Sequence, residues 1–162
     1  MSYPAPRYLR ETGELTATFR RADDPAELRT TTGFCHYLAT GKSTSGQFGL
    51  YRWDMGPEPS GPGPHFHRTM SESFFVLSGT VQIYDGTTWV DTRPGDFTFV
   101  PEGGVHGFRN ESGEPASILI LFAPGAPREA YFEGLMEIAA MPEKPSAAEL
   151  ADFYARHDNI WL

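Results

Sequence analysis

The sequence has almost no cysteine and no long apolar stretch. Cys35 is the one cysteine among 162 residues, which excludes a disulfide framework within the chain. No segment approaches the roughly 18 consecutive apolar residues that span a bilayer, and no basic region followed by an apolar run stands at the N-terminus. We therefore expect a protein of the cytoplasm.

Positive charge is also scarce. Thirteen Lys and Arg residues stand against 21 Asp and Glu residues, so the formal net charge is −8 and the pI is about 5.0. A nucleic-acid-binding domain would carry a basic stripe, and an anionic membrane surface would repel this chain. We expect neither a nucleic acid nor a membrane as a partner.

Turn-forming residues, by contrast, are abundant. The chain has 17 glycines and 14 prolines, which favours short strands joined by turns. Runs of β-branched and aromatic residues between the turns predict strands over 33–38, 47–53, 73–77, 80–84, 96–100 and 116–122. The Asp85-Gly86 pair predicts a hairpin. This pattern is typical of an all-β sandwich or barrel.

The length suits a single domain over residues 1–162. Within it we distinguish an N-terminal arm (1–31), a β-barrel (32–124) and two C-terminal α-helices (125–162). The alternating stretch Leu15–Phe19 is a candidate edge strand in the arm. Apolar residues at helical spacing over 128–138, and a capping box at 146–149, predict the helices. The arm and the strand edges suit pairing between subunits, so we expect a homodimer.

Three histidines and one glutamate form the pattern with the clearest chemistry. His65 and His67 are one residue apart, so on a strand both imidazoles lie on the same face. Glu72 has the opposite parity and joins them only if residues 68–71 bend the chain. His106 follows the Pro-Glu-Gly-Gly turn at 101–104 and is the fourth candidate. Three imidazoles and a carboxylate suit one divalent transition metal ion, which is Fe, Mn, Co, Ni, Cu or Zn.

Two motifs built on these residues resemble those of the cupin superfamily. The first, G-x5-H-x-H-x(3,4)-E-x6-G, is matched from His65 to Gly79, with Pro59 in place of the first glycine. The second, G-x5-P-x-G-x2-H-x3-N, is matched completely from Gly95 to Asn110. The resemblance covers about residues 44–124. It implies a double-stranded β-helix, or jelly-roll barrel, in which the three histidines and the glutamate bind the metal.

Shorter stretches, at 45–48, 61–64, 72–79 and 124–132, are similar to quercetin-2,3-dioxygenase-like cupins. In that group the metal-binding glutamate can also deprotonate a flavonol hydroxyl, which implies both roles for Glu72. The leading hypothesis is a metal-dependent dioxygenase that acts with O2 on a flavonol-like or other enolisable aromatic substrate. A non-oxidative polyketide cyclase or isomerase is an alternative, and so is a metal-bearing module that binds a small molecule without turnover.

Several aromatic side chains are candidates for the wall of a substrate pocket, although a barrel core needs such residues too. Phe74 and Phe108 share the parity of the proposed ligands and are the better candidates. Tyr51 and Trp53 are also candidates, on a strand whose inward face the sequence leaves open. We interpret His36 as structural, with an acid–base role as the alternative.

Overall fold

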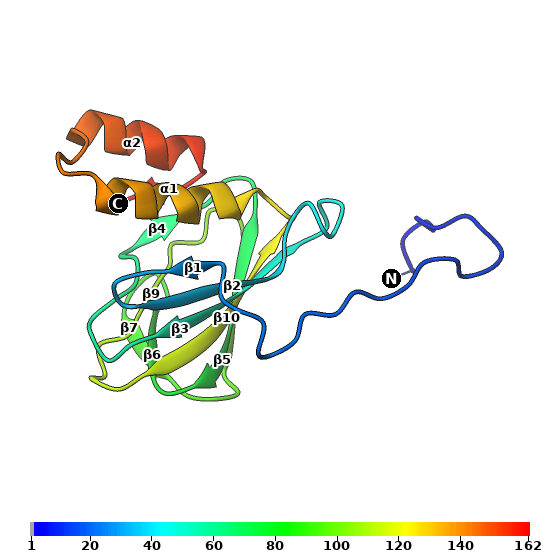
Figure 1. Cartoon of the computed structure of the whole chain (residues 1–162), viewed down its shortest axis with the longest axis horizontal. Coiled ribbons are helices and arrows are strands. Elements are labelled where there is room, and N and C mark those ends of the chain that lie inside the picture. The colour runs from blue at the N-terminus through cyan, green and yellow to red at the C-terminus, as the bar shows by residue number, and fades with distance from the viewer. Residues whose placement is uncertain (1) are drawn as a thin grey trace.

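This computed structural model describes residues 2–162. The largest of its sheets has six strands (Figure 1). Its neighbours pair antiparallel in the order β1-β2-β3-β10-β5-β8. The bounds are β1 (Leu28–Arg29), β2 (Gly33–Ala39), β3 (Gly49–Met55), β10 (Ala116–Ala123), β5 (Ser71–Ser78) and β8 (Phe97–Val100). Each strand predicted for this sheet is confirmed to within a few residues.

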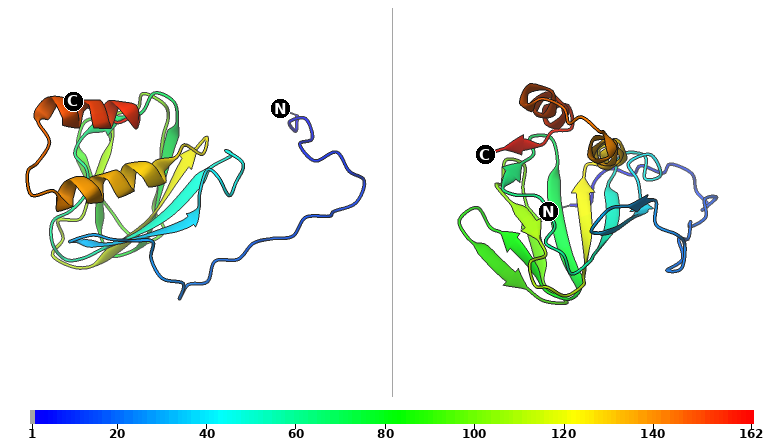
Figure 2. Two further views of the ribbon diagram at one scale, coloured as in Figure 1. Left: turned by 45° about the horizontal axis from the view of Figure 1, so that its top comes forward. Right: turned by 60° about the vertical axis from the view of Figure 1, so that its left-hand side comes forward.

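Two smaller sheets face the large one. One has the order β7-β6-β9, and in the other β4 pairs with β11. Their bounds are β6 (Val81–Tyr84), β7 (Trp89–Thr92), β9 (Gly107–Arg109), β4 (His65–Phe66) and β11 (Ile160–Trp161). Single bridges, Ser60–Asn110 and His65–His106, join the β4 segment to the β9 segment. Figure 2 shows the facing sheets meeting at one end and opening toward the helices at the other.

Strand β10 supplies the centre of the core. Its side chains alternate between buried and half-buried along all eight residues, as expected for a strand with one face inward. Ile118, Ile120 and Phe122 point inward and are buried with Phe74 and Val76 of the neighbouring β5. Burying each such side chain contributes about 1.5–3 kcal/mol. These side chains form the core between the facing sheets.

Helices α1 (Arg128–Ala140) and α2 (Ala147–Arg156) lie over the open end of the barrel (Figures 1 and 2). Both helices are confirmed, including the capping box in which Ser146 and Glu149 exchange hydrogen bonds. Phe132 of α1 packs edge-on against Tyr51 and Trp53 of β3, with ring centroids 5.2 and 5.4 Å apart. Neither helix of residues 2–162 has the length and apolar character needed to cross a membrane.

The N-terminal segment differs from expectation. Leu15–Phe19 forms no strand, and both of these named side chains are exposed. A short alternating stretch gains stability only by pairing with a neighbour, and none lies beside it among residues 2–162. Regular structure instead begins inside the predicted arm, at β1. The chain also returns to the barrel after the helices as β11, which the sequence did not indicate.

Candidate metal centre and its cavity

Four buried side chains converge at the open end of the barrel: His65, His67, Glu72 and His106. One ligand atom from each lies within 4.8 Å of all the others. Reciprocal backbone hydrogen bonds of 2.8 and 2.9 Å hold His65 directly opposite His106. The structure therefore brings together all the ligands expected from the sequence, in a geometry compatible with one shared metal ion.

Each imidazole is oriented by a backbone carbonyl. Nδ1 of His65 donates to the Gly63 carbonyl and Nδ1 of His106 to the Gly104 carbonyl, both at 2.9 Å. Nδ1 of His67 donates to the carbonyl of Asp158 at 2.5 Å. These bonds fix the orientation of each ring and turn its Nε2 toward the centre of the cluster, which is the usual support for metal-binding histidines.

Glu72 lies between two of these imidazoles. Its Oε2 is 2.9 Å from Nε2 of His67 and 2.8 Å from Nε2 of His106. Burial opposes ionisation of Glu72, but the hydrogen bonds with the two histidines outweigh burial and lower its pKa. Burial, with the neighbouring His106, lowers the pKa of His65 to about 4. At neutral pH the centre thus offers a carboxylate and a neutral imidazole, which are the forms that bind a metal.

The expected bend between His67 and Glu72 is present at Arg68 and Thr69. The residue that holds this bend, Asp158, lies about 90 positions later in the sequence. The carboxylate of Asp158 accepts hydrogen bonds from the backbone N–H groups of Arg68 and Thr69 at 2.8–3.0 Å, and one from the Thr69 hydroxyl at 2.7 Å. Partial burial opposes ionisation of Asp158, but these bonds outweigh it and lower its pKa.

The same C-terminal segment covers the cluster. Trp161 pairs with His65 across the β4–β11 ladder, and its ring centroid lies 5.0 Å from the imidazole. No motif in the sequence marks Asp158 or Trp161, because both act on residues about 90 positions earlier. They were missed for that reason.

We expect Asp158→Ala to weaken metal binding about 10-fold or more, the usual size of effect when a group that orients a ligand is lost. The backbone of Asp158 has a positive φ of 55°, which asparagine tolerates better than alanine. Asp158→Asn, which also keeps a side-chain acceptor, is the matched control and should lose much less. Competition titration against a chelator measures both affinities. Unchanged affinity in Asp158→Ala would show that the bend holds without this residue.

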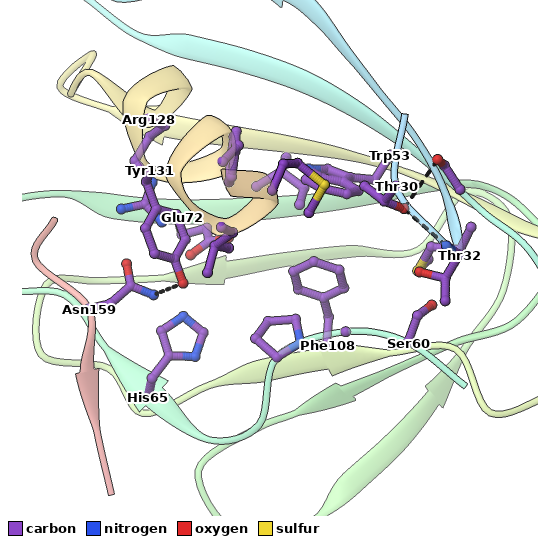
Figure 3. A pocket seen from close by; sticks show the side chains of 18 of the residues that line it. Thr30, Thr32, Trp53, Ser60, His65, Glu72, Phe108, Arg128, Tyr131 and Asn159 are labelled. Carbon is purple, nitrogen blue, oxygen red and sulfur yellow. Dashed lines mark hydrogen bonds between the residues drawn. The ribbon is translucent and has the colours of Figure 1, made fainter. Parts of the chain in front are cut away.

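A cavity of about 320 Å³ opens from the metal centre toward the gap between α1 and the sheet (Figure 3). Two of the cluster residues, His65 and Glu72, form part of its wall. Most of the remaining wall is apolar or aromatic. It comes from β3, β9 and β10, from α1 and α2, and from β11: Trp53, Met55, Phe108, Ile120, Phe122, Tyr131, Phe132, Leu135, Met136, Tyr154 and Trp161. Such a cavity suits a small organic molecule.

Two of the four predicted pocket aromatics, Trp53 and Phe108, lie in this wall. The prediction for the other two requires correction. Tyr51 is fully buried outside the lining, and its hydroxyl donates to Glu129 at 2.5 Å. Phe74 is also buried outside the lining, and its ring packs against those of Phe108 and His106, with centroids 5.5 and 5.9 Å apart. Parity identified the inward face but could not give the depth of each side chain.

His36 lies on β2, outside the cavity lining. Its Nε2 is 3.0 Å from Asp54 and 2.9 Å from the guanidinium of Arg52, both on the adjacent β3. This cross-strand group agrees with a structural role for His36.

Motif positions outside the four-residue cluster stabilise the backbone around it. Asn110 is buried, and its amide donates to the carbonyls of Gly56 and Glu114 at 2.9 and 2.7 Å. Gly61 compensates for Pro59 at the unmatched glycine. Its φ is +120°, and a Cβ there would lie 2.1 Å from the Phe108 carbonyl oxygen. Glycine is thus required here, two positions later than the motif has it.

Comparison with known proteins agrees with this geometry. Residues 51–122 match the family model described as a cupin domain. Quercetin 2,3-dioxygenase from Bacillus subtilis (strain 168) is 32% identical over 75 residues, which are 46% of this chain. The match spans 22% of that relative's length.

Solved structures show the same fold. An uncharacterized conserved protein with a double-stranded β-helix domain from Klebsiella pneumoniae subsp. pneumoniae MGH 78578 has a TM-score of 0.56 and 18% identity, covering 69% of this chain and 94% of that one. The polyketide cyclase RemF from Streptomyces resistomycificus has a TM-score of 0.56 and 23% identity, covering 67% and 80%. The predicted jelly-roll fold is confirmed, and residues 51–122 of the chain match a cupin domain.

Proposed function

We propose that this protein is a metal-dependent enzyme acting on a small aromatic, enolisable substrate, and that it is a dioxygenase. One observation carries the proposal. Both histidine contacts of Glu72 use Oε2, and Oε1 has no hydrogen-bond partner among residues 2–162. Because Glu72 also lines the cavity, a carboxylate oxygen remains for a substrate proton.

The donor set fits a divalent transition metal ion held by His65, His67, Glu72 and His106. The three imidazoles and the carboxylate are buried and converge on one point. The imidazoles are oriented by the hydrogen bonds of their Nδ1 atoms. When bound, such an ion supplies Lewis acidity that lowers the pKa of a substrate hydroxyl, and a redox-active one also supplies electron transfer to O2. Glu72 takes the hydroxyl proton as general base.

The cavity walls position the substrate. The rings of Trp53, Phe108 and Phe132 line it together with the aliphatic side chains of α1. Flat apolar walls bury an aromatic ring and hold its hydroxyl toward Glu72. They also limit water around the reacting atoms, which strengthens the electrostatic interactions there.

Oxygen consumption tests the reaction class. Tag-free protein is isolated without added metal, its metal content is measured by mass spectrometry, and O2 uptake is followed with a flavonol such as quercetin. We expect near-stoichiometric Fe, Mn, Co, Ni or Cu and O2 uptake that depends on the flavonol. The similarity to a quercetin dioxygenase supports this choice. A metal-loaded protein that consumes no O2 with any enolisable aromatic would contradict the dioxygenase.

A non-oxidative cyclase or isomerase is the second candidate, favoured by the shared fold with a polyketide cyclase. The same four ligands would then hold Zn²⁺ or a similar ion, and product would form in the absence of O2. The third candidate is a binding module, for which a ligand would copurify and no product would form. Anaerobic product analysis separates these two from the dioxygenase.

We also propose that the protein is a homodimer. Phe97 and Phe99 on β8 are 64% and 59% exposed, and Phe75 of β5 lies beside them on the same outer face. Strand β8 ends the larger sheet, so its outer edge lacks a neighbouring strand. A second copy related by a two-fold axis would cover the aromatic patch and pair the edge.

Replacing Phe97 and Phe99 together by serine should therefore convert a dimer into a monomer, because the apolar contact area is lost. Light scattering after size exclusion measures the mass. Val90→Ser removes an exposed apolar side chain from the other sheet and should leave the dimer intact. A wild-type protein that elutes as a monomer would contradict the proposal.

A further inference from the structure

Four buried side-chain polar atoms have no hydrogen-bond partner among residues 2–162. All of them belong to residues that line the cavity: Trp53 Nε1, Ser60 Oγ, Arg128 Nε and Asn159 Oδ1. Buried polar atoms in a folded protein nearly always have a partner, and a lone one costs stability. Their concentration in one cavity indicates that atoms of a ligand complete these bonds.

Arg128 is the most demanding of the four. It is the first residue of α1 and only 3% exposed. Its guanidinium lies over the rings of Phe122 and Tyr131, with its central carbon 4.8 and 4.3 Å from their centroids. Its one side-chain hydrogen bond to residues 2–162 runs from Nη1 to the carbonyl of His157 at 2.7 Å. A buried arginine normally also pairs with a carboxylate.

No carboxylate of residues 2–162 lies within 4 Å of this guanidinium. Glu72 is near enough to interact electrostatically, but its Oε2 contacts His67 and His106, and neither of its oxygens lies within 4 Å of the guanidinium. With a divalent cation bound, the metal centre is itself positive. The end of the cavity beside Arg128 therefore carries uncompensated positive charge, which favours an anionic ligand.

Resting on the small-molecule site proposed above, we propose that Arg128 binds a carboxylate of the ligand, so that the cavity prefers an aromatic carboxylic acid to a neutral aromatic of the same shape. Asn159 orients a second donor, the Tyr131 hydroxyl, while its own unpaired Oδ1 can only accept and so pairs with a donor of the ligand other than the carboxylate. Its amide donates to the Tyr131 hydroxyl at 3.1 Å, which leaves that hydroxyl's own proton for a carboxylate oxygen. The planar guanidinium presents parallel N–H groups that match the two oxygens of a carboxylate.

The remaining unpaired atoms lie at the other end of the cavity. In Figure 3, Trp53 and Ser60 are opposite the end that holds Glu72, Arg128 and Asn159. The indole N–H of Trp53 can only donate, so the far end of the substrate carries an acceptor such as a carbonyl or hydroxyl oxygen. The ligand is thus elongated, with a carboxylate at one end and a neutral polar group at the other.

Binding of a matched pair of probes tests this inference. 2-Naphthoate and 2-naphthamide have the same rings and nearly the same shape, but only the first carries a negative charge. We expect wild-type protein to bind the naphthoate about 10- to 100-fold more tightly by calorimetry, the usual effect of a hydrogen-bonded charge. In Arg128→Met this preference should fall to near unity while affinity for the amide changes little.

A control variant and the choice of readout make the result specific. Arg109→Met removes an arginine that also lies over a ring, that of Trp89, but outside the cavity, and should keep the preference. The experiment measures binding rather than turnover, so its outcome is independent of whether the metal-dependent reaction takes place. Equal binding of both probes by wild type would overturn the proposal, and so would a preference that survives Arg128→Met.

Discussion

Glu72→Gln should retain most of its metal and lose about 10²- to 10⁴-fold in turnover. The amide keeps an oxygen that can bind the metal and fills the same buried space between His67 and His106. It has no basic oxygen to accept the hydroxyl proton, and general base catalysis typically contributes a factor of this size. Metal content by mass spectrometry and kcat with the substrate found in the oxygen assay are measured on the same preparation.

Glu129→Gln is the matched control. Glu129 is also a carboxylate, in the first turn of α1, but it accepts a hydrogen bond from Tyr51 and lies outside the metal cluster. Its replacement should leave metal content and kcat within a few-fold of wild type. Full turnover in Glu72→Gln would remove the base role of Glu72, and loss of metal along with turnover would reduce Glu72 to a ligand.

The second large effect is expected for His65→Ala/His67→Ala. Two of four ligands are lost, so metal content should fall from near one equivalent to near zero, with turnover at background. Wild-type protein should also melt at a lower temperature after chelation, because a metal that binds only the folded state stabilises it. The double variant should melt at the same temperature with and without a chelator.

His36→Ala is the control for the general destabilisation that follows when a buried histidine is removed. His36 is buried on β2 but pairs with Asp54 and Arg52, away from the cluster. It should keep the metal and the chelator-dependent shift, although its melting temperature falls. Metal retained in the double variant at wild-type level would place the binding site elsewhere.

The convergence of the four-residue cluster was predictable because its constraints are local in sequence. The parity of His65 and His67 on one strand, and the polar bend that brings Glu72 to the same face, are decided by neighbouring residues. His106 was found through the second motif, whose Asn110 and glycines shape the turns around it. The alternating strands and the helix cap were predictable for the same reason, because neighbouring residues in the sequence determine them.

The end of the cavity lined by Arg128 and Asn159 could not be predicted in this way. Arg128 reads as an ordinary first residue of an amphipathic helix, and Asn159 follows a helix end; only the packing of α1 over the barrel buries them together. The difference between Trp53 and Tyr51 has the same origin. Both side chains lie on the same face of β3. The packing of α1 leaves Trp53 in the cavity wall and buries Tyr51 outside it.

The dependence of His67 on Asp158 has a consequence for the order of assembly. The carbonyl that orients this imidazole is 91 residues further along the chain, and Asp158 also secures the bend before Glu72. During synthesis the barrel strands emerge first, so the histidines meet before their last support exists. The newly made barrel should take up metal weakly and exchange it freely until the C-terminal segment docks. Docking would then trap the ion, making metal exchange in the finished protein as slow as the release of β11.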